Sequence, residues 1–358
     1  MTQPQTLRGQ RLSRRVVIAS ALATPFIRPA HAEERAITFM GYSGIFQASY
    51  QKAVLDPFMQ AHPDIKVTYY GLPNSAQMLG TLRAQKAAPQ VDVCLFDSTF
   101  SKTGLDEDII QPLGRDAMPV MADLDARAFR AGVGGPAVTY DNLTLTYAPE
   151  QVKPPPTSWK VLWDKQYSGK IVIPGMPDLT GAGLVFVANH MAGADYATST
   201  KAGFEAVAEM APLVLNWDPK PDTYSFVIDG RAALGVGWNA RGQIYATQNP
   251  GRIAATLPDE GSFLIINTIN LIKNAPQTDA AKQFIAYALS PEAQVAFADL
   301  MFYAPTNTKA ALSDATLKKI PVATPEGQAR LFPLDWMVVA AMRDKLNQDW
   351  RRQVLTRG

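Results

Sequence analysis

Two aspartates and two aromatic residues stand where they could hold a small charged molecule. Asp97 follows the apolar run VDVCLF, and Asp178 precedes a predicted helix. Either carboxylate could pair with an amine, and the rings of Tyr42 and Trp238 could face a cation or an aliphatic chain. Structural roles compete with these. Asp97 could only cap a helix, Asp178 could only shape the turn after Pro177, and Trp238 ends a buried strand and could belong to the core.

Motifs for nucleotide binding and nucleophilic catalysis are weak or incomplete. Residues 235–240 match G-x-G-x-x-A after a predicted strand, but a tryptophan stands inside the turn and no clear βαβ unit follows. A second match at 132–137 has a proline where a helix should start. The segment 41–44 is no nucleophile elbow, because Ile45 occupies the final glycine position. A hydrolase built on Ser43 would need a histidine partner, of which few exist. We therefore expect no enzymatic activity.

Cysteine and histidine are scarce. The single cysteine, Cys94, excludes an intramolecular disulfide, a cysteine-rich zinc site and an iron–sulfur cluster. The histidines His31, His62 and His190 leave little for a histidine-based metal centre. We therefore expect neither a cofactor nor a metal ion.

Length and composition indicate a folded chain. It has 358 residues, of which 47% are apolar and 18% charged, so it can bury a substantial core. The length argues for two domains or one large one. The 34 basic and 32 acidic residues give a net charge of +2. No dense basic patch accompanies this charge, so nothing indicates a nucleic-acid partner.

The first 32 residues have the pattern of an export signal. They hold five arginines and no acidic residue, and the paired arginines Arg14-Arg15 precede the short apolar stretch Val16–Ile27. Ala30-His31-Ala32 supplies a small-x-small cleavage pattern. The paired arginines favour a twin-arginine signal over an ordinary secretory one. Cleavage before Glu33 would leave 29 basic against 32 acidic residues, a net charge of −3 in the periplasm.

From residue 36 onward, strand patterns alternate with helical spacing. This alternation predicts an α/β fold with a mostly parallel, doubly wound sheet. The first predicted elements are strand Ala36–Tyr42, helix Gln47–His62, strand Ile65–Gly71, helix Ser75–Ala88 with Ser75 as its N-cap, and strand Val91–Phe96.

A second α/β unit follows an extended stretch at Val138–Tyr147 and three prolines at 154–156. Its predicted elements are a helix over Ser158–Tyr167, a strand over Lys170–Pro174, a helix from Gly181, a helix over Thr200–Met210, and strands over Leu213–Trp217, Ala232–Trp238 and Ile253–Leu257.

The stretch Phe263–Ile272 is predicted to return to the first unit. The helices Thr278–Leu289 and Glu292–Met301 follow it, and Asp335–Val354 is predicted as one long amphipathic helix. We therefore expect lobe 1 over 33–140 plus 268–358 and lobe 2 over 141–267, joined by a two-strand hinge. The strand-end loops of both sheets would share a cleft that closes on a ligand by hinge bending.

Several segments have the order and spacing of a known family. They are Lys52–Phe58 with Pro63–Val67, Val91–Val93 leading to Asp97-Ser98, Thr157–Ile171, Gly237–Asn239, and Ala280–Phe284 with Leu289–Gln294. Together they resemble the periplasmic solute-binding proteins of ABC importers, of the double-crossover (type II) kind. The branch they resemble most is the spermidine/putrescine-type and iron-type one. The resemblance covers nearly all of the chain after the export signal.

The resemblance implies ligand contacts in the strand-end loops. By position these are Tyr42, Ser43, Gly44, Phe46, Asp97, Ser98, Thr99, Phe100, Asp178, Thr180, Gly181, Trp238, Asn239, Asn267, Thr268 and Tyr303. Serine, threonine and glycine at helix N-termini also suit a carboxylate or another anion. The ligand class therefore stays open between a mono-amine or amino-acid-like compound and a small organic anion.

The sequence departs from both patterns of this branch. The polyamine binders carry a tryptophan and an aspartate two residues apart at the return crossing, and here those positions are Ile265 and Asn267. The iron binders need an adjacent tyrosine pair facing the cleft. Tyr69-Tyr70 lies within a predicted strand, where neighbours point to opposite faces. We therefore expect no iron site.

The resemblance implies a binding protein that delivers its small-molecule ligand to membrane permease subunits. We expect a monomer that performs no chemistry and has no nucleic-acid partner. A ligand-sensing subunit with the same fold is the alternative, and an exported enzyme is disfavoured.

Overall fold

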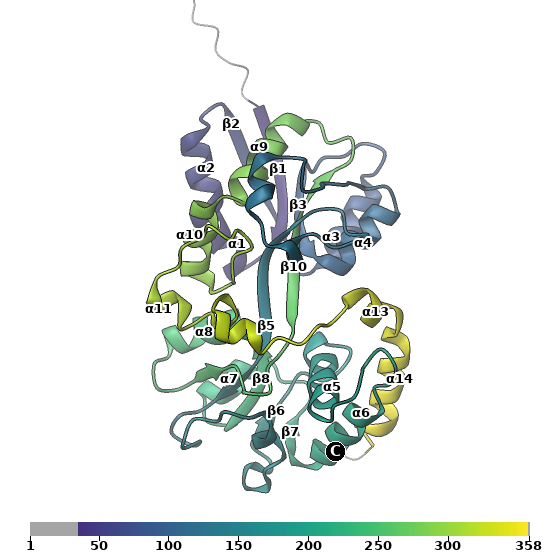
Figure 1. Cartoon of the computed structure of the whole chain (residues 1–358), viewed down its shortest axis with the longest axis vertical. Helices are drawn as coiled ribbons and strands as arrows, with labels where there is room; N and C mark the ends of the chain where they lie inside the picture. The colour runs from purple at the N-terminus through teal and green to yellow at the C-terminus, as the bar shows by residue number, and fades with distance from the viewer. Residues whose placement is uncertain (1–34, 357–358) are drawn as a thin grey trace, which may run out of the picture. The chain divides into compact units, whose positions relative to one another are not determined.

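The structure, a computed structural model, describes residues 35–356, which form two lobes joined by long strands (Figure 1). The predicted export signal and its cleavage site lie outside the described residues. Within residues 35–356, no helix combines the length and the apolar character that a bilayer span requires.

The first lobe is organised around a strand that pairs in parallel with a neighbour on each side, β1 with β2 and β3. A π-helical turn joins α1 to α2, so these segments form the helix predicted over Gln47–His62. The elements of this lobe are β1 (Arg35–Tyr42), α1 (Ile45–Tyr50), η1 (Gln51–Leu55), α2 (Asp56–Ala61), β2 (Ile65–Leu72), α3 (Ser75–Ala84), β3 (Val93–Asp97), α4 (Ser98–Asp106), β4 (Ile110–Gln111), η2 (Pro119–Asp123), η3 (Ala126–Ala128), α9 (Thr278–Ala288), α10 (Pro291–Met301), α11 (Asp314–Leu317), η7 (Pro321–Ala323) and α12 (Pro325–Ala329).

The second lobe repeats this plan with shorter strands, since β6 pairs in parallel with both β7 and β8. Its elements are η4 (Trp159–Trp163), η5 (Lys165–Tyr167), β6 (Ile171–Val172), α5 (Leu179–Met191), α6 (Lys201–Met210), η6 (Ala211–Leu213), β7 (Val214–Asn216), α7 (Thr223–Ile228), β8 (Leu234–Trp238), α8 (Asn239–Gln248), β9 (Ala254–Thr256), α13 (Trp336–Ala341) and α14 (Arg343–Gln353).

Two antiparallel strands, β5 (Ala137–Tyr147) and β10 (Leu264–Ile272), belong to both lobes. β10 pairs with β3 and β4 in the first lobe, and β5 pairs with β8 and β9 in the second. They join the two parallel sheets into one ten-stranded sheet, in which eight strands follow the order β2-β1-β3-β10-β5-β8-β6-β7, while β4 pairs with β10 and β9 pairs with β5. The predicted α/β class and the two-strand connection are therefore confirmed.

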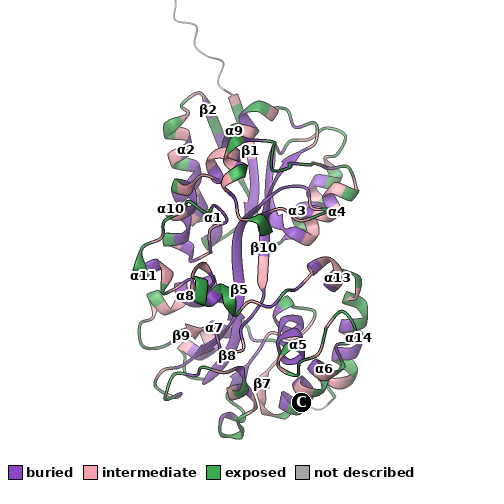
Figure 2. Cartoon of the chain, in the orientation of Figure 1, coloured by how far each residue is buried: buried purple, intermediate pink, exposed green. Residues whose placement is uncertain are grey.

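Each lobe has its own apolar core, and the strands that run through these cores are mostly buried (Figure 2). The first core contains Phe39, Phe58 and Phe284, which pack ring against ring. The second contains Trp159, fully buried, whose indole Nε1 donates to the carbonyl of Gly261 at 2.8 Å. These cores make each lobe a support that can hold strand-end residues in place.

The C-terminal segment differs from the prediction. Met342 interrupts the predicted single helix and separates α13 from α14. Their side chains Trp336, Leu346 and Trp350 lie in the core of the second lobe, although residues 268–358 were expected with the first. The physical reason is burial, because α14, which carries Leu346 and Trp350, packs beside α6, and Trp336 packs edge to face on Phe263. The domain boundaries otherwise stay a prediction.

Two local predictions also differ from the structure. The N-cap of α3 is Asn74, whose side chain accepts from the Gln77 N–H, so the expected Ser75 cap is wrong. The segment predicted as one helix over 158–167 forms two 3-10 turns. The side chain of Asp164 accepts from the N–H of Gln166 and so starts a second turn where a continuous helix would have run on.

Candidate functional site

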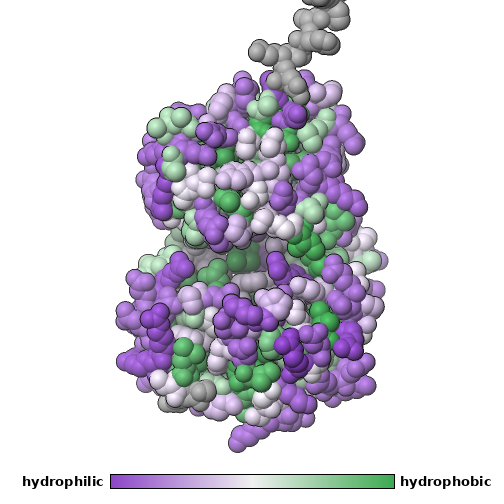
Figure 3. All heavy atoms as spheres, turned by 180° about the vertical axis from the view of Figure 1, so that it is seen from behind, coloured by the Kyte–Doolittle hydropathy of each residue, from purple (hydrophilic) through white to green (hydrophobic). Residues whose placement is uncertain are grey.

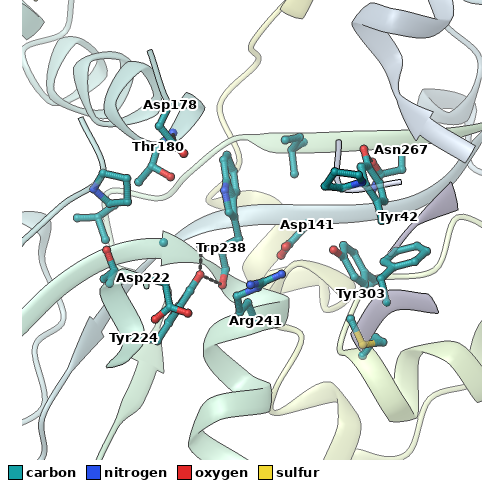
Figure 4. A pocket seen from close by; sticks show the side chains of 18 of the residues that line it. Tyr42, Asp141, Asp178, Thr180, Asp222, Tyr224, Trp238, Arg241, Asn267 and Tyr303 are labelled. Carbon is teal, nitrogen blue, oxygen red and sulfur yellow. Dashed lines mark hydrogen bonds between the residues drawn. The ribbon is translucent and has the colours of Figure 1, made fainter. Parts of the chain in front are cut away.

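A cavity of about 380 Å³ lies between the lobes. Its volume is in the range of small-molecule sites. The surface is hollowed between the lobes (Figure 3), and the cavity wall is drawn in Figure 4. Strand ends and helix starts supply most of this wall, as expected for facing parallel sheets.

The first lobe contributes an aromatic and amide wall. Tyr42 ends β1, and its hydroxyl lies 2.8 Å from Ser75 Oγ and donates to Asn267 Oδ1 at 3.1 Å. Asn267 Nδ2 in turn donates to Thr139 Oγ1 at 3.0 Å. Tyr303 follows α10 and completes this wall (Figure 4). Burial raises the pKa of Tyr42 well above its usual range, so its hydroxyl stays neutral and keeps its proton for hydrogen bonding.

The second lobe contributes a tryptophan at the end of β8. The Trp238 N–H donates to the Tyr224 hydroxyl at 2.7 Å, and that hydroxyl donates to the Trp238 carbonyl at 3.1 Å. Gly237 permits this approach, because a Cβ there would lie 2.4 Å from the same hydroxyl. The Trp238 ring packs edge to face on Phe263 at 6.4 Å and remains partly exposed to the cavity.

Asp141 is the most buried charged side chain of the wall. It lies on β5 and is 4% exposed. Its Oδ1 accepts from the N–H groups of Asn142 at 2.8 Å and Ala240 at 3.1 Å. Its Oδ2 accepts no hydrogen bond from residues 35–356. Burial raises the pKa of Asp141 to about 7, and the two N–H groups and the charge of Arg241 offset this only in part.

The other two aspartates of the wall cap helices. Asp178 Oδ1 accepts from the Thr180 N–H at 2.7 Å at the start of α5. Asp222 Oδ1 accepts from the N–H and the hydroxyl of Ser225, and its Oδ2 accepts from the Tyr245 hydroxyl at 2.9 Å. Both oxygens of Asp222 are therefore engaged, whereas Asp178 keeps one oxygen for another partner.

The structure brings half of the predicted contact residues to this cavity. The lining residues among them are Tyr42, Ser43, Phe46, Asp178, Thr180, Trp238, Asn267 and Tyr303. Their contact with a ligand stays a prediction.

The other half of the predicted contacts do not line the cavity. Asp97 is 6% exposed and caps α4 by accepting from the Thr99 N–H, the structural role that competed with ligand binding. The Asn239 amide donates to the Lys319 carbonyl. The remaining members of this group are Gly44, Ser98, Thr99, Phe100, Gly181 and Thr268.

Sequence reasoning missed much of the wall. The missed lining residues are Pro73, Asp141, Pro174, Asp222, Thr223, Tyr224, Val236, Gly237, Arg241, Ile265 and Met301. A signal existed for Asp141, because a lone acid stands in the otherwise uncharged strand VTYDNLTLTY. A signal also existed for Arg241, which lies three residues after Trp238 and so about one helical turn away.

The groups considered for metal or iron binding are placed elsewhere. Tyr69 packs against Phe39, and its hydroxyl donates to the Tyr42 carbonyl, whereas Tyr70 is 39% exposed. His190 stacks on Phe332 at 4.1 Å. Within the described part of the chain, no cluster of three or more His, Cys, Asp or Glu side chains could hold a metal ion.

A family model described as "Bacterial extracellular solute-binding protein" matches residues 53–324. Among curated proteins, spermidine/putrescine-binding periplasmic protein 1 of Haemophilus influenzae is 26% identical over 253 residues, which are 66% of each chain. The gamma-aminobutyric acid-binding protein of Pseudomonas aeruginosa is 22% identical over 324 residues, 85% of this chain and 87% of that one.

Solved structures share the fold at low identity. An ABC transporter protein from Clostridium perfringens superposes with a TM-score of 0.74 at 24% identity and covers 89% of this chain and 99% of that one. A spermidine/putrescine ABC transporter substrate-binding protein from Streptococcus pneumoniae gives 0.74 at 16% identity, with the same coverage. The fold is that of the type II periplasmic binding proteins, and the chain belongs to the family of bacterial extracellular solute-binding proteins.

Proposed function

We propose that this protein is the extracytoplasmic binding component of an ABC importer and captures a small organic amine between its lobes. The observation that carries the proposal is Asp141, a buried carboxylate whose Oδ2 accepts no hydrogen bond from residues 35–356 and which lies beside the rings of Trp238 and Tyr303 (Figure 4). A carboxylate among aromatic faces attracts a cation through charge and through the ring quadrupoles.

An ammonium group at Asp141 would relieve an electrostatic cost. Burial disfavours the charged form of Asp141 by more than its two N–H donors and the charge of Arg241 offset, which is why its pKa is raised to about 7. A bound ammonium supplies that counter-charge and a hydrogen-bond donor for Oδ2. Two relatives, a spermidine/putrescine-binding protein and a gamma-aminobutyric acid-binding protein, support an amine as the ligand class.

The proposed cycle involves binding without chemistry. The lobes close on the ligand by bending of β5 and β10, and the closed form docks on permease subunits in the membrane. Binding of simple amines to the purified protein tests this, because a ligand of the folded state raises the melting temperature as its concentration exceeds Kd. A concentration-dependent upward shift with at least one organic amine is expected. If neutral sugars raise the melting temperature and none of the tested amines does, the proposal is contradicted.

Replacing Trp238 with alanine should weaken amine binding by about 1–3 kcal/mol, the usual cost of losing a well-packed aromatic contact. Trp238→Phe keeps a ring and should retain most of the affinity. Isothermal titration of both variants against the best amine measures the effect. Equal affinity of a folded Trp238→Ala protein and the parent would remove this ring from the site.

We also propose that residues 1–32 direct export and are removed in the periplasm. The support is their charge pattern and the family of the rest of the chain. Sequencing the N-terminus of protein recovered from the periplasmic fraction should give a start near Glu33. An intact N-terminus at Met1 would contradict the assignment.

A further inference from the structure

We infer that Arg241 binds a carboxylate of the ligand, so the captured solute is an amino-acid-like zwitterion and not a diamine. This inference rests on the proposed function, because it adds a second charged group to the amine placed at Asp141. It also makes Arg241 the residue that determines specificity between two classes of amine.

Arg241 is the single cationic side chain among the residues that line the cavity. It lies in the first turn of α8, close in sequence to Trp238. Within residues 35–356 its guanidinium makes no hydrogen bond and no ion pair. The matched residue Arg252, beyond the end of the same helix, instead donates twice to the Ile228 carbonyl. Arg241 therefore presents free donors to the cavity.

The guanidinium lies near the proposed ammonium site but is not joined to it. Burial raises the pKa of Asp141 and of Tyr303, and the positive charge of Arg241 partly offsets both rises, as expected for a guanidinium close to these two groups. Figure 4 shows Arg241 beside Trp238 and on the same side of the cavity as Asp141. A carboxylate–guanidinium contact within 4.0 Å is absent between the two described side chains. A ligand with one anionic and one cationic end can satisfy both.

The rest of the wall offers a poor place for a second ammonium. Asn267 stands at the return crossing as an amide, and its oxygen and nitrogen are engaged by Tyr42 and Thr139. Both oxygens of Asp222 are likewise engaged. Apart from Asp141, the one aspartate among the described lining residues with an oxygen that accepts no hydrogen bond is Asp178. A diamine would also bring a second positive charge toward Arg241, which repels it.

The competing explanation is that Arg241 only balances the charge of Asp141. In that case its removal would alter the binding of every amine to the same degree. If Arg241 binds a carboxylate, its removal weakens the binding of amino acids and not the binding of diamines. Comparing two series of matched length separates these explanations, namely ω-amino acids and α,ω-diamines with two to six carbons in the chain.

The experiment is isothermal titration of both series against the parent protein, Arg241→Gln, Arg241→Lys and Arg252→Gln. The parent should bind its best amino acid at least about tenfold more tightly than the diamine of equal length. Arg241→Gln should lower the affinity for the amino acid about 10- to 100-fold and leave the affinity for the diamine undiminished. Arg241→Lys should fall between, because lysine keeps the charge without the bidentate fork. Arg252→Gln removes a charge outside the cavity and should match the parent.

Each contrary outcome has its own meaning. The carboxylate contact is overturned if the parent binds diamines more tightly than amino acids, or if Arg241→Gln lowers the affinity for both series equally. Either result leaves amine capture standing. Failure of both series to bind the folded parent overturns amine capture itself. Melting temperatures of the variants establish that they are folded, so a loss of affinity is not mistaken for unfolding.

Discussion

Asp141→Asn should weaken amine binding by about 2–5 kcal/mol, roughly 30-fold or more in Kd, the cost of removing one partner of a buried charge pair. Asparagine keeps an oxygen that can accept from the Ala240 N–H, so the local backbone is preserved. It loses the negative charge that would face the ligand's ammonium. Isothermal titration with the best amine measures the loss.

The same substitution should have the opposite effect on the ligand-free protein. Burial raises the pKa of Asp141 from 3.8 to about 7. Between these values the folded protein holds a proton that the unfolded chain has released, so stability falls as pH rises from about 4 to about 7 and then levels off. Asparagine has no proton to lose. Above pH 7 the variant should exceed the parent by up to about 4 kcal/mol in the free energy of unfolding.

The comparison isolates Asp141 because burial also raises the pKa of Asp92 and of Asp97, which shape the parent's pH profile in the same direction. Only the difference between parent and variant reports on position 141. Asp229→Asn, at an exposed residue paired with Arg231, is the matched control and should leave both binding and the pH profile unchanged. An Asp141→Asn protein that binds the amine as tightly as the parent would rule out the proposed ammonium contact.

Trp159→Ala should destabilise the protein by about 3–5 kcal/mol, the largest stability effect expected here. The indole is fully buried in the second core, and its Nε1 donates to the Gly261 carbonyl at 2.8 Å. Truncation leaves a cavity and a buried carbonyl without its donor. Urea unfolding monitored by circular dichroism measures the change.

Trp159→Phe is the matched control for this prediction. It fills most of the space and loses the hydrogen bond, so it should cost clearly less than alanine. Trp159 lies outside the cavity wall, so the folded alanine variant should still bind the amine. A Trp159→Ala protein as stable as the parent would mean that the core around this side chain collapses to fill the space.

Most strands could be predicted because each is a short apolar run between turn signals, and such a pattern is local. β1, β2 and β3 appear within two residues of their predicted bounds. The single C-terminal helix was wrong because its pattern does not reveal the break at Met342. Which lobe that segment joins depends on its packing against elements distant in sequence, such as that of α14 on α6, which no local pattern encodes.

The same distinction between local pattern and tertiary packing separates the site residues that could be predicted from those that could not. Strand-end positions such as Tyr42 and Trp238 could be predicted, because a family resemblance fixes where strands end. Asp141 and Arg241 were missed although each left a local signal, because that signal does not show which side chains face the cavity, and this depends on how β5 pairs and how α8 is rotated. Asp97 illustrates the converse, since a strand-end acid turned inward to cap the next helix.

The crossing strands also constrain the order in which the protein can be completed during synthesis. β10 pairs with β3 through contacts such as Asn267 with Asp97, so the sheet of the first lobe needs a strand encoded after nearly all of the second. The ribosome must therefore release residues up to Ile272 before the first lobe can close its sheet. Until then the inner edge of β3 is unpaired, and the nascent chain carries an open sheet edge of the kind that invites aggregation.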